Sequence, residues 1–281
     1  MDLKLDWLSF TYKPDRDAYK KFFGYEVGLK SQFNDDIIEN IDQMTDIDLF
    51  FLDFPEFEKI KDEFCIISGF SHYENILGYM GISDTCRISY NTEGYTSVNM
   101  GVNVSIPSHG LDWFFDLMDV DIDANDSVCQ LFKILKERSC HCSRIDLAFD
   151  DYSKRFRPKD YIAWFYSGNL RTNFKKIQSA STQHCIGHTL YIGSRRHRMI
   201  RIYDKDFESK GAVDAVRYEF EMHQEDSRDL FEFLSNNNTV NFISLLRSFF
   251  DVIDTEDNKN RSRCRLLPEW EQWLNELDFC E

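Results

Sequence analysis

The sequence predicts an α+β fold in which an antiparallel sheet is covered by helices. Three segments alternate apolar and polar residues with the two-residue period of a strand: 144–150, 189–205 and 216–222. The middle segment is broken by Gly193 and Ser194 and then resumes, which is typical of a hairpin that joins two antiparallel strands. Helical apolar patterns are expected at 158–167, 226–234, 241–252 and 267–277.

The first half of the chain follows a less regular pattern. A first strand is expected over 3–12, with Trp7 and Phe10 in the core, and a helix over 15–23. Further strands are expected over 64–71, 85–90 and 96–106, and helices over 111–118 and 127–137.

Charge separates the chain into two parts. The 281 residues carry a net charge of −16, and residues 1–130 hold 9 basic and 25 acidic side chains. Residues 154–205 hold 12 basic and only two acidic ones, which is enough local positive charge to bind a phosphate backbone. We therefore expect an acidic N-terminal lobe, 1–130, and a catalytic lobe, 131–281. The catalytic lobe contains the hairpin 189–205, called the tyrosine hairpin after Tyr203 on its return strand, and the C-terminal helices.

Several classes of protein are excluded by composition. No apolar run could span a bilayer, and the N-terminus lacks the pattern of a secretory signal. The eight cysteines form no CxxC pair, so a zinc ribbon is not expected, and reduced thiols suit a cytoplasmic protein. The acidic stretch 119–126 lacks the glycine and the closing glutamate of a calcium-binding loop.

The hairpin combines a tyrosine with a row of cations. On its return strand Arg201, Tyr203 and Lys205 share one face, because alternate residues of a strand point the same way. Arginine binds phosphate through two parallel hydrogen bonds, and lysine adds a point charge. The same surface is expected to bind the DNA backbone through further basic residues: Arg195, Arg196 and Arg198 at the tip, and Lys175 and Lys176 before it.

The two other strands carry carboxylates opposite an apolar face. Asp146 and Asp150 share a face of 144–150, and Glu219 and Glu221 share a face of 216–222. If these strands are neighbours, the carboxylates converge beside Tyr203, where hard oxygen ligands would suit Mg²⁺ or Mn²⁺. The alternative for each carboxylate is a solvated strand face. Nearby cations or a metal are expected to favour the phenolate of Tyr203.

Other residues offer weaker candidates. Tyr191 lies across the hairpin and is a second possible nucleophile, although a packed cross-strand aromatic explains it better. His184 and His188 could line a metal site, but surface histidines fit this stretch better. Cys140 and Cys142 read as core thiols rather than ligands.

The order and spacing of six elements resemble the replication initiation factor family, which includes rolling-circle plasmid and phage initiators and related relaxases. The elements are Asp-Trp-Leu-Ser-Phe-Thr (6–11), Met-Gly-Val-Asn-Val-Ser-Ile (100–106), Ser-Arg-Ile-Asp-Leu-Ala-Phe-Asp-Asp (143–151), Thr-Leu-Tyr-Ile-Gly-Ser-Arg (189–195), Arg-Ile-Tyr-Asp-Lys (201–205) and Arg-Tyr-Glu-Phe-Glu (217–221). The hairpin with Arg-Ile-Tyr-Asp-Lys is the most specific of these.

The resemblance implies a metal-dependent DNA nickase that starts replication at an origin. Tyr203 would become joined to the 5′ phosphate and leave a free 3′ hydroxyl for a polymerase. Asp146 and Glu219 would be the leading ligands of a divalent metal, Mg²⁺ or Mn²⁺, followed by Glu221 and Asp150. The implied partners are single-stranded or cruciform origin DNA, with a host helicase and polymerase, and a homodimer is compatible with the family.

The chain departs from the family in two places. Residues 105–110 read Ser-Ile-Pro-Ser-His-Gly where a Ser-Gly-x-Gly element is often found, and the N-terminal half is unusually acidic. The implied catalytic sheet is similar to that of the HUH nucleases, but no His-hydrophobe-His motif is present.

Three other functions remain open at this point. A relaxase would use the same chemistry at a transfer origin. A nuclease that activates water would need the carboxylates and leave Tyr203 a structural role. An origin-binding protein without activity would bind DNA regardless of metal or of Tyr203.

Overall fold

The computed structural model describes residues 3–15, 17–18, 46–55, 65–68, 87–90, 102–108, 110–111, 115, 125–181 and 187–278. The chain divides into two compact units. The first consists of Met1–Trp7, Asp121–Lys133 and Arg144–Glu281, and the second of Leu8–Val120 and Ile134–Ser143. Met1–Trp7, expected in the acidic lobe, therefore lies in the same unit as the tyrosine hairpin.

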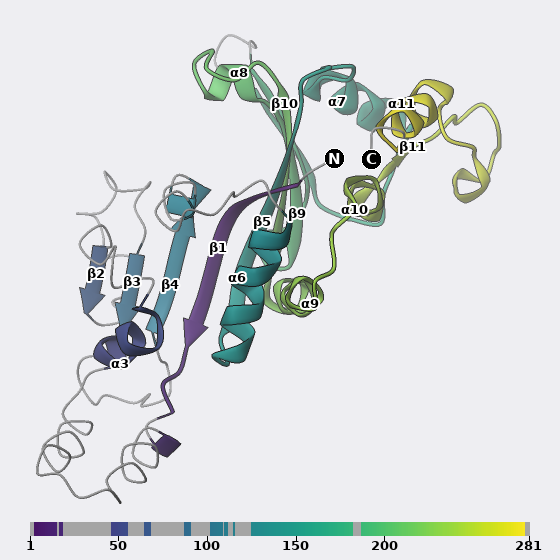
Figure 1. The fold of residues 1–281 in the computed structure, drawn as a ribbon. Helices are drawn as coiled ribbons and strands as arrows, with labels where there is room; N and C mark the ends of the chain where they lie inside the picture. Colours follow the sequence, from purple (N-terminus) through teal and green to yellow (C-terminus); the bar gives the residue numbers. More distant parts are fainter. Residues whose placement is uncertain are drawn as a thin grey trace, which may run out of the picture. The chain divides into compact units, whose positions relative to one another are not determined.

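The first unit is built on an antiparallel sheet (Figure 1). Its strands are β5 (His141–Asp151), β7 (Ile177–Ser181), β8 (His188–Gly193), β9 (Arg198–Asp204) and β10 (Val216–His223), in the order β5-β10-β9-β8-β7. The three strand segments predicted around the charged face are thus confirmed, and they are neighbours in one sheet. β7 was not predicted, because Ile177–Ser181 is mostly polar and exposed.

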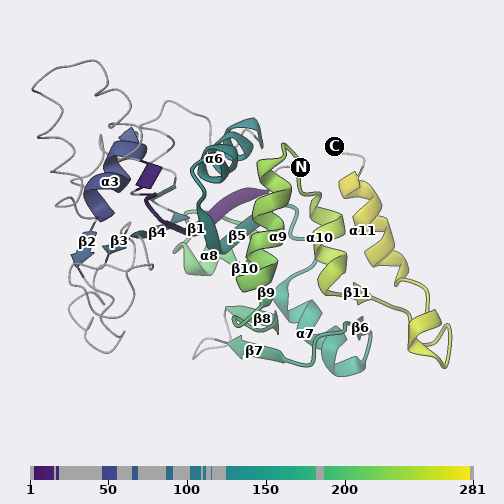
Figure 2. The same cartoon turned by 90° about the horizontal axis from the view of Figure 1, so that it is seen from below.

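Helices cover one face of this sheet and form the core with it. They are α7 (Pro158–Ser167), α9 (Gln224–Ser235), α10 (Phe242–Phe249) and α11 (Pro268–Asp278), and Figure 2 shows the last three side by side. The buried cluster joins Ile200 and Ile202 of β9 and Tyr218 and Phe220 of β10 to aromatic side chains of the helices. The predicted α+β class and antiparallel sheet of this unit are confirmed.

The ends of the helices follow the expectations closely, with one difference. α10 ends at Phe249, and the chain then forms the short strand β11 (Asp251–Val252), which pairs with β6 (Leu170–Arg171). Two smaller elements complete the unit: α8 (Lys205–Glu208) directly after β9, and the 3-10 turn η4 (Arg261–Arg263). Trp270 and Trp273 of α11 are fully buried, as expected for residues on one side of that helix.

The second unit contains β2 (Cys65–Ser68), β3 (Arg87–Tyr90), β4 (Val102–Pro107) and the helix α3 (Asp46–Asp53). β3 pairs antiparallel with β4 but parallel with β2, so antiparallel pairing does not hold throughout the chain. In β1 (Lys4–Tyr12), the core expectation holds for Phe10 but not for Trp7, which is only half-buried. α3 was not predicted.

Part of the first-half prediction lies outside the described residues. This is so for most of the helix expected at 15–23, for 96–101 of one strand, and for most of the helix at 111–118. The helix expected over 127–137 is confirmed as α6 (Asn125–Glu137). No helix among the described residues has both the length and the apolar character needed to cross a membrane.

Gly193 sets the geometry of the hairpin tip. Its φ is +104°, and a Cβ atom placed there would overlap the carbonyl oxygen of Arg198. Since both the backbone conformation and the space exclude a side chain, we expect Gly193→Ala to lower the free energy of unfolding by roughly 1–3 kcal/mol. Urea unfolding measures this, with Gly211→Ala as a control for positive φ alone, because its Cβ would meet no atom within 4 Å. Equal losses in the two variants would contradict the steric part of this explanation.

Candidate active site

The site lies on the sheet face opposite the helices, where strand register places charged residues in rows. Tyr203 of β9 is the register partner of Arg217 on β10, and Arg217 is also the partner of Asp150 on β5. The next row contains Arg201 and Glu219. One row further, Glu221 pairs with Asp146. The sheet therefore brings the predicted tyrosine and all four predicted carboxylates onto one face.

Tyr203 is almost fully buried on this face, with 9% of its surface exposed. Its hydroxyl donates a hydrogen bond to Oε2 of Glu219 at 3.2 Å. The guanidinium carbon of Arg201 lies 5.7 Å from the centre of its ring, and Nζ of Lys205 lies 5.8 Å from it. The predicted neighbourhood of Arg201 and Lys205 is present, although Lys205 begins α8 instead of continuing the strand.

The expectation that this neighbourhood favours the phenolate is wrong for the protein alone. Burial is the largest influence and raises the pKa of Tyr203 far above its ordinary value, and the charge of Glu219 raises it further. Arg217 and Arg201 act in the opposite direction but do not compensate. Tyr203 is therefore a neutral phenol that must transfer its proton during any attack.

Glu219 is placed to receive that proton. Its carboxylate contacts both the hydroxyl of Tyr203 and Nη2 of Arg201. Burial raises the pKa of Glu219, and Arg201 only partly offsets this effect. A carboxylate with a raised pKa is a better base than an exposed one, which suits general base catalysis.

Asp146 is held by the arginine two residues before it. Nε of Arg144 lies 2.9 and 3.0 Å from the two carboxylate oxygens of Asp146, and Nη2 adds a third contact. Burial raises the pKa of Asp146 to about 7 in spite of this arginine, with Glu221 and Glu219 as additional causes. The side chain is thus a desolvated carboxylate next to two others.

This shift predicts a pH dependence of stability. A carboxyl group with a raised pKa in the folded state stabilises the fold while it is protonated, and that contribution is lost as the pH rises from about 4 to about 7. Relative to Asp146→Asn, the wild type is expected to lose up to roughly 4 kcal/mol of unfolding free energy across this range. Urea unfolding of both proteins at several pH values measures the difference. A difference that stays constant would mean that Arg144 keeps Asp146 ionised throughout.

Glu221 is fully buried yet surrounded by nitrogen atoms of arginine and histidine side chains. Nε of Arg201 lies 3.2 Å from its Oε1, and Nε of Arg195 and Nε2 of His223 each lie 3.5 Å from its Oε2. Burial works against the ionised form, but the hydrogen bond of His223 and the nearby arginines lower the pKa of Glu221 below its ordinary value. From the described residues Oε1 accepts no hydrogen bond, despite the nearby guanidinium.

Asp150 lies on the predicted face and is held there by Arg217. Arg217 donates to both of its carboxylate oxygens, at 2.7 and 2.6 Å, and also binds Asp6 of β1 at 3.1 Å. Register brings Arg217 and Asp150 together, because the two residues lie directly opposite each other. Asp150 therefore holds Arg217 beside Tyr203 and is a poor candidate for a metal ligand.

The remaining carboxylates fit a divalent cation in part. Among the described residues, no three His, Cys, Asp or Glu side chains converge as a ready metal site. Asp146 and Glu221 are nevertheless adjacent and buried, and Oε1 of Glu221 lacks a hydrogen bond. Mg²⁺ is commonly bound by one or two carboxylates, with water and substrate phosphate completing its shell. The donor set meets that requirement.

The basic residues predicted to contact DNA lie on different surfaces. Arg195 at the tip has 69% of its side chain exposed, and Arg196, Lys175 and Lys176 are exposed as well.

Arg198 instead lies on the core face, where its guanidinium is 5.3 Å from the ring centres of Phe174 and of Phe249. Arg198 therefore does not share the face of Tyr203, and its contact with DNA stays a prediction. It shares the parity of Ile200 and Ile202, so the signal was present in the sequence.

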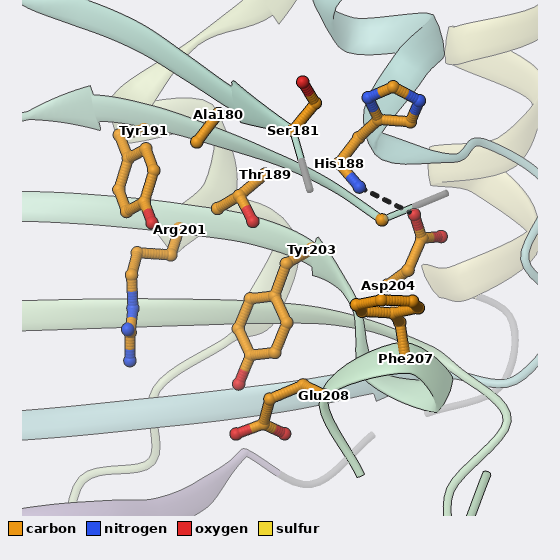
Figure 3. A pocket seen from close by; sticks show the side chains of 11 residues that line it. Ala180, Ser181, His188, Thr189, Tyr191, Arg201, Tyr203, Asp204, Phe207 and Glu208 are labelled. Atoms are coloured by element: carbon orange, nitrogen blue, oxygen red, sulfur yellow. Dashed lines mark hydrogen bonds between the residues drawn. The ribbon is translucent and has the colours of Figure 1, made fainter. Parts of the chain in front are cut away.

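A cavity of about 290 Å³ opens beside Tyr203 (Figure 3). Thr189 and Tyr191 of β8 and Arg201 of β9 line it, and α8 contributes Phe207 and Glu208. Tyr191, the second candidate nucleophile, thus borders the same space as Tyr203. Sequence reasoning missed Phe207, which carries no charge signal.

The secondary candidates are placed as follows. His188 is half-buried at the start of β8, and its backbone N–H points to Asp204, while His184 lies outside the described residues. Cys140 and Cys142 are buried free thiols, and burial raises the pKa of Cys140 to about 12. Both are core residues, as predicted.

Asp6 was not predicted as part of the site, since its contact with Arg217 joins positions far apart in the chain.

Comparisons with known proteins found one matching family and one similar structure. The model of the family described as "Replication initiation factor" matches residues 141–279. The fold is similar to that of a rolling-circle replication initiator protein from Geobacillus stearothermophilus, with a TM-score of 0.66 and 18% sequence identity over 98% of this chain and 96% of that one. A search of curated proteins gave no match. Residues 141–279, which match the replication initiation factor family, contain every member of the site except Asp6.

Proposed function

We propose that this protein initiates rolling-circle DNA replication by nicking one strand at an origin, with Tyr203 as the nucleophile. The observation that carries the proposal is the hydrogen bond from the Tyr203 hydroxyl to the buried carboxylate of Glu219, within a row of arginines. This places a nucleophile, a proton acceptor and phosphate-binding groups together on one rigid sheet face. The family and the similar initiator structure support the same role.

The reaction can be followed by its bonds. Oη of Tyr203 attacks the phosphorus atom as its proton passes to Glu219, which lies 3.2 Å away. A bond forms between phosphorus and Oη, and the bond between phosphorus and the 3′ oxygen breaks. The 3′ oxygen takes up a proton and becomes a free hydroxyl that a polymerase can extend. Reversal of these steps rejoins a strand, because the phosphotyrosine ester conserves the broken bond.

Arg201 is the residue best placed to bind the phosphate. It already contacts Glu219 and Glu221, and it lies over the edge of the cavity beside Tyr203 (Figure 3). A phosphate oxygen can take one of these positions, since a guanidinium offers several donors in one plane. Arg195 at the exposed tip would hold the backbone further along the strand.

Asp146 and Glu221 are the proposed ligands of a divalent metal, Mg²⁺ or Mn²⁺. When bound, such a metal would polarise the phosphodiester and stabilise the leaving 3′ oxygen. Glu219, expected from the resemblance to be a leading ligand, is assigned here to proton transfer because its observed contact is with the Tyr203 hydroxyl. Asp150 is assigned to the support of Arg217.

The decisive experiment is a search for a covalent adduct. The wild type is incubated with single-stranded oligonucleotides that tile the DNA around its own coding sequence, with and without Mn²⁺, and the products are separated under denaturing conditions. We expect a metal-dependent band of protein joined to DNA, with the modified peptide containing Tyr203 by mass spectrometry. Cleaved DNA without an adduct would identify a nuclease that uses water instead.

A further inference from the structure

The cavity beside Tyr203 has a chemistry of its own, distinct from that of the charged sheet face. It lies at the start of β8 and the end of β9, and α8 closes one side of it (Figure 3). With a volume of about 290 Å³ it is near the lower limit for small-molecule sites, so it suits a ligand of the size of a single nucleoside.

Its lining combines an exposed aromatic ring with acidic and hydroxyl groups. Phe207 on α8 keeps 45% of its surface exposed and presents its aromatic ring to the cavity. The carboxylates of Asp204 and Glu208 and the hydroxyl of Thr189 also face this space (Figure 3). Arg201, a cation, lies on the same side of the cavity as Tyr203 (Figure 3).

This distribution of charge argues against a phosphate as the occupant. Each carboxylate is already paired with a cation, Asp204 with Arg157 and Glu208 with Lys205, so these pairs leave little net positive charge for a phosphodiester inside the cavity, whereas Arg201 attracts one at its edge. An uncharged nucleobase needs no such charge and offers a flat surface to an aromatic ring. Carboxylates also accept hydrogen bonds from the amino groups of bases, as they do with cytosine.

We propose that this cavity holds the unstacked base of the nucleotide next to the scissile phosphate, stacked on Phe207. The inference rests on the proposed nicking function and adds to it a subsite for a base. Phe207 follows Tyr203 by only four residues, and α8 begins where β9 ends. A base fixed on Phe207 would therefore fix the adjoining phosphate relative to the Tyr203 hydroxyl, which is the alignment that an in-line attack requires.

The test measures binding rather than cleavage, so it does not depend on the nicking reaction. In a Tyr203→Phe background, fluorescence anisotropy identifies the single-stranded oligonucleotide that binds best among those tiling the DNA around the coding sequence. An abasic residue is then moved along that oligonucleotide, one position at a time. The scan is repeated with Phe207→Ala, and with Phe233→Ala as the matched control, because Phe233 on α9 is 44% exposed and borders no part of this cavity.

One abasic position is expected to weaken binding by about 5- to 150-fold, the range for loss of one base stacked on an aromatic side chain. Phe207→Ala should weaken binding of the intact oligonucleotide to a similar extent and remove the effect of that abasic position, while Phe233→Ala should leave the scan unchanged. A scan in which no position depends on Phe207 would overturn the inference. If the wild type forms the covalent adduct while the scan in the Tyr203→Phe background is flat, the base subsite alone is refuted. If one abasic position depends on Phe207 but the wild type forms no adduct, the nicking function alone is refuted.

Discussion

Tyr203→Phe is expected to eliminate the covalent protein–DNA adduct and to reduce strand nicking by at least about a thousandfold. The substitution removes one oxygen atom and leaves the ring between Arg201 and Lys205. Because the hydroxyl donates only one hydrogen bond in the structure, to Glu219, little else should change in the fold. Denaturing gel electrophoresis of the reaction with labelled single-stranded DNA measures both adduct and nick.

Tyr191→Phe is the matched control for this prediction. Tyr191 borders the same cavity from the neighbouring strand, but within the described part of the chain its hydroxyl contacts no carboxylate, whereas that of Tyr203 contacts Glu219. The Tyr191 variant should still form the adduct. Transfer of the DNA to Tyr191 in the Tyr203→Phe protein, or loss of the adduct in Tyr191→Phe alone, would contradict the assignment of the nucleophile.

Glu219→Gln is expected to slow adduct formation by about 10²- to 10⁴-fold, the usual contribution of a general base. The amide keeps the shape of the side chain but cannot take the proton of Tyr203. In the wild type the rate should rise with pH through the raised pKa of Glu219, because only the ionised carboxylate accepts a proton. The Gln variant should lack this rise.

Single-turnover rates over a range of pH, at saturating DNA, separate this role from a structural one. Glu276→Gln serves as the control, since Glu276 is an exposed carboxylate on α11 that pairs with Arg155. It should keep both the rate and the pH profile of the wild type. If Glu219→Gln lowered the rate equally at every pH, the residue would position Tyr203 or Arg201 without accepting the proton.

The face on which each catalytic strand carries its charged residues could be predicted, because apolar and polar residues alternate along a strand between its buried and its other face. Ile200 and Ile202 identify the core side of β9, and Tyr203 then has to lie on the other side. The same rule predicted the shared face of Asp146 and Asp150, and that of Glu219 and Glu221.

Which side chains pair across the sheet could not be predicted, because that depends on register. Arg217 binds Asp150 and Asp6 rather than Glu219, and both contacts join distant parts of the sequence. The protonation of Tyr203 was missed for a related reason. Its cationic neighbours are visible in the sequence, whereas the desolvation that outweighs them appears only after the strands assemble.

The contact between Asp6 and Arg217 has a consequence for how the site is assembled during synthesis. Residues 1–7 are synthesised before the rest of their unit, which is completed only when residues beyond 144 follow, so its closing contacts span a large part of the sequence. Contacts of such long range slow folding, because a large loop must close before they form. A fragment that starts at residue 141 would also leave Arg217 with Asp150 as its one carboxylate partner. Removing the N-terminal strand should therefore disturb the arginine opposite Tyr203, although that strand lies more than a hundred residues from every other member of the site.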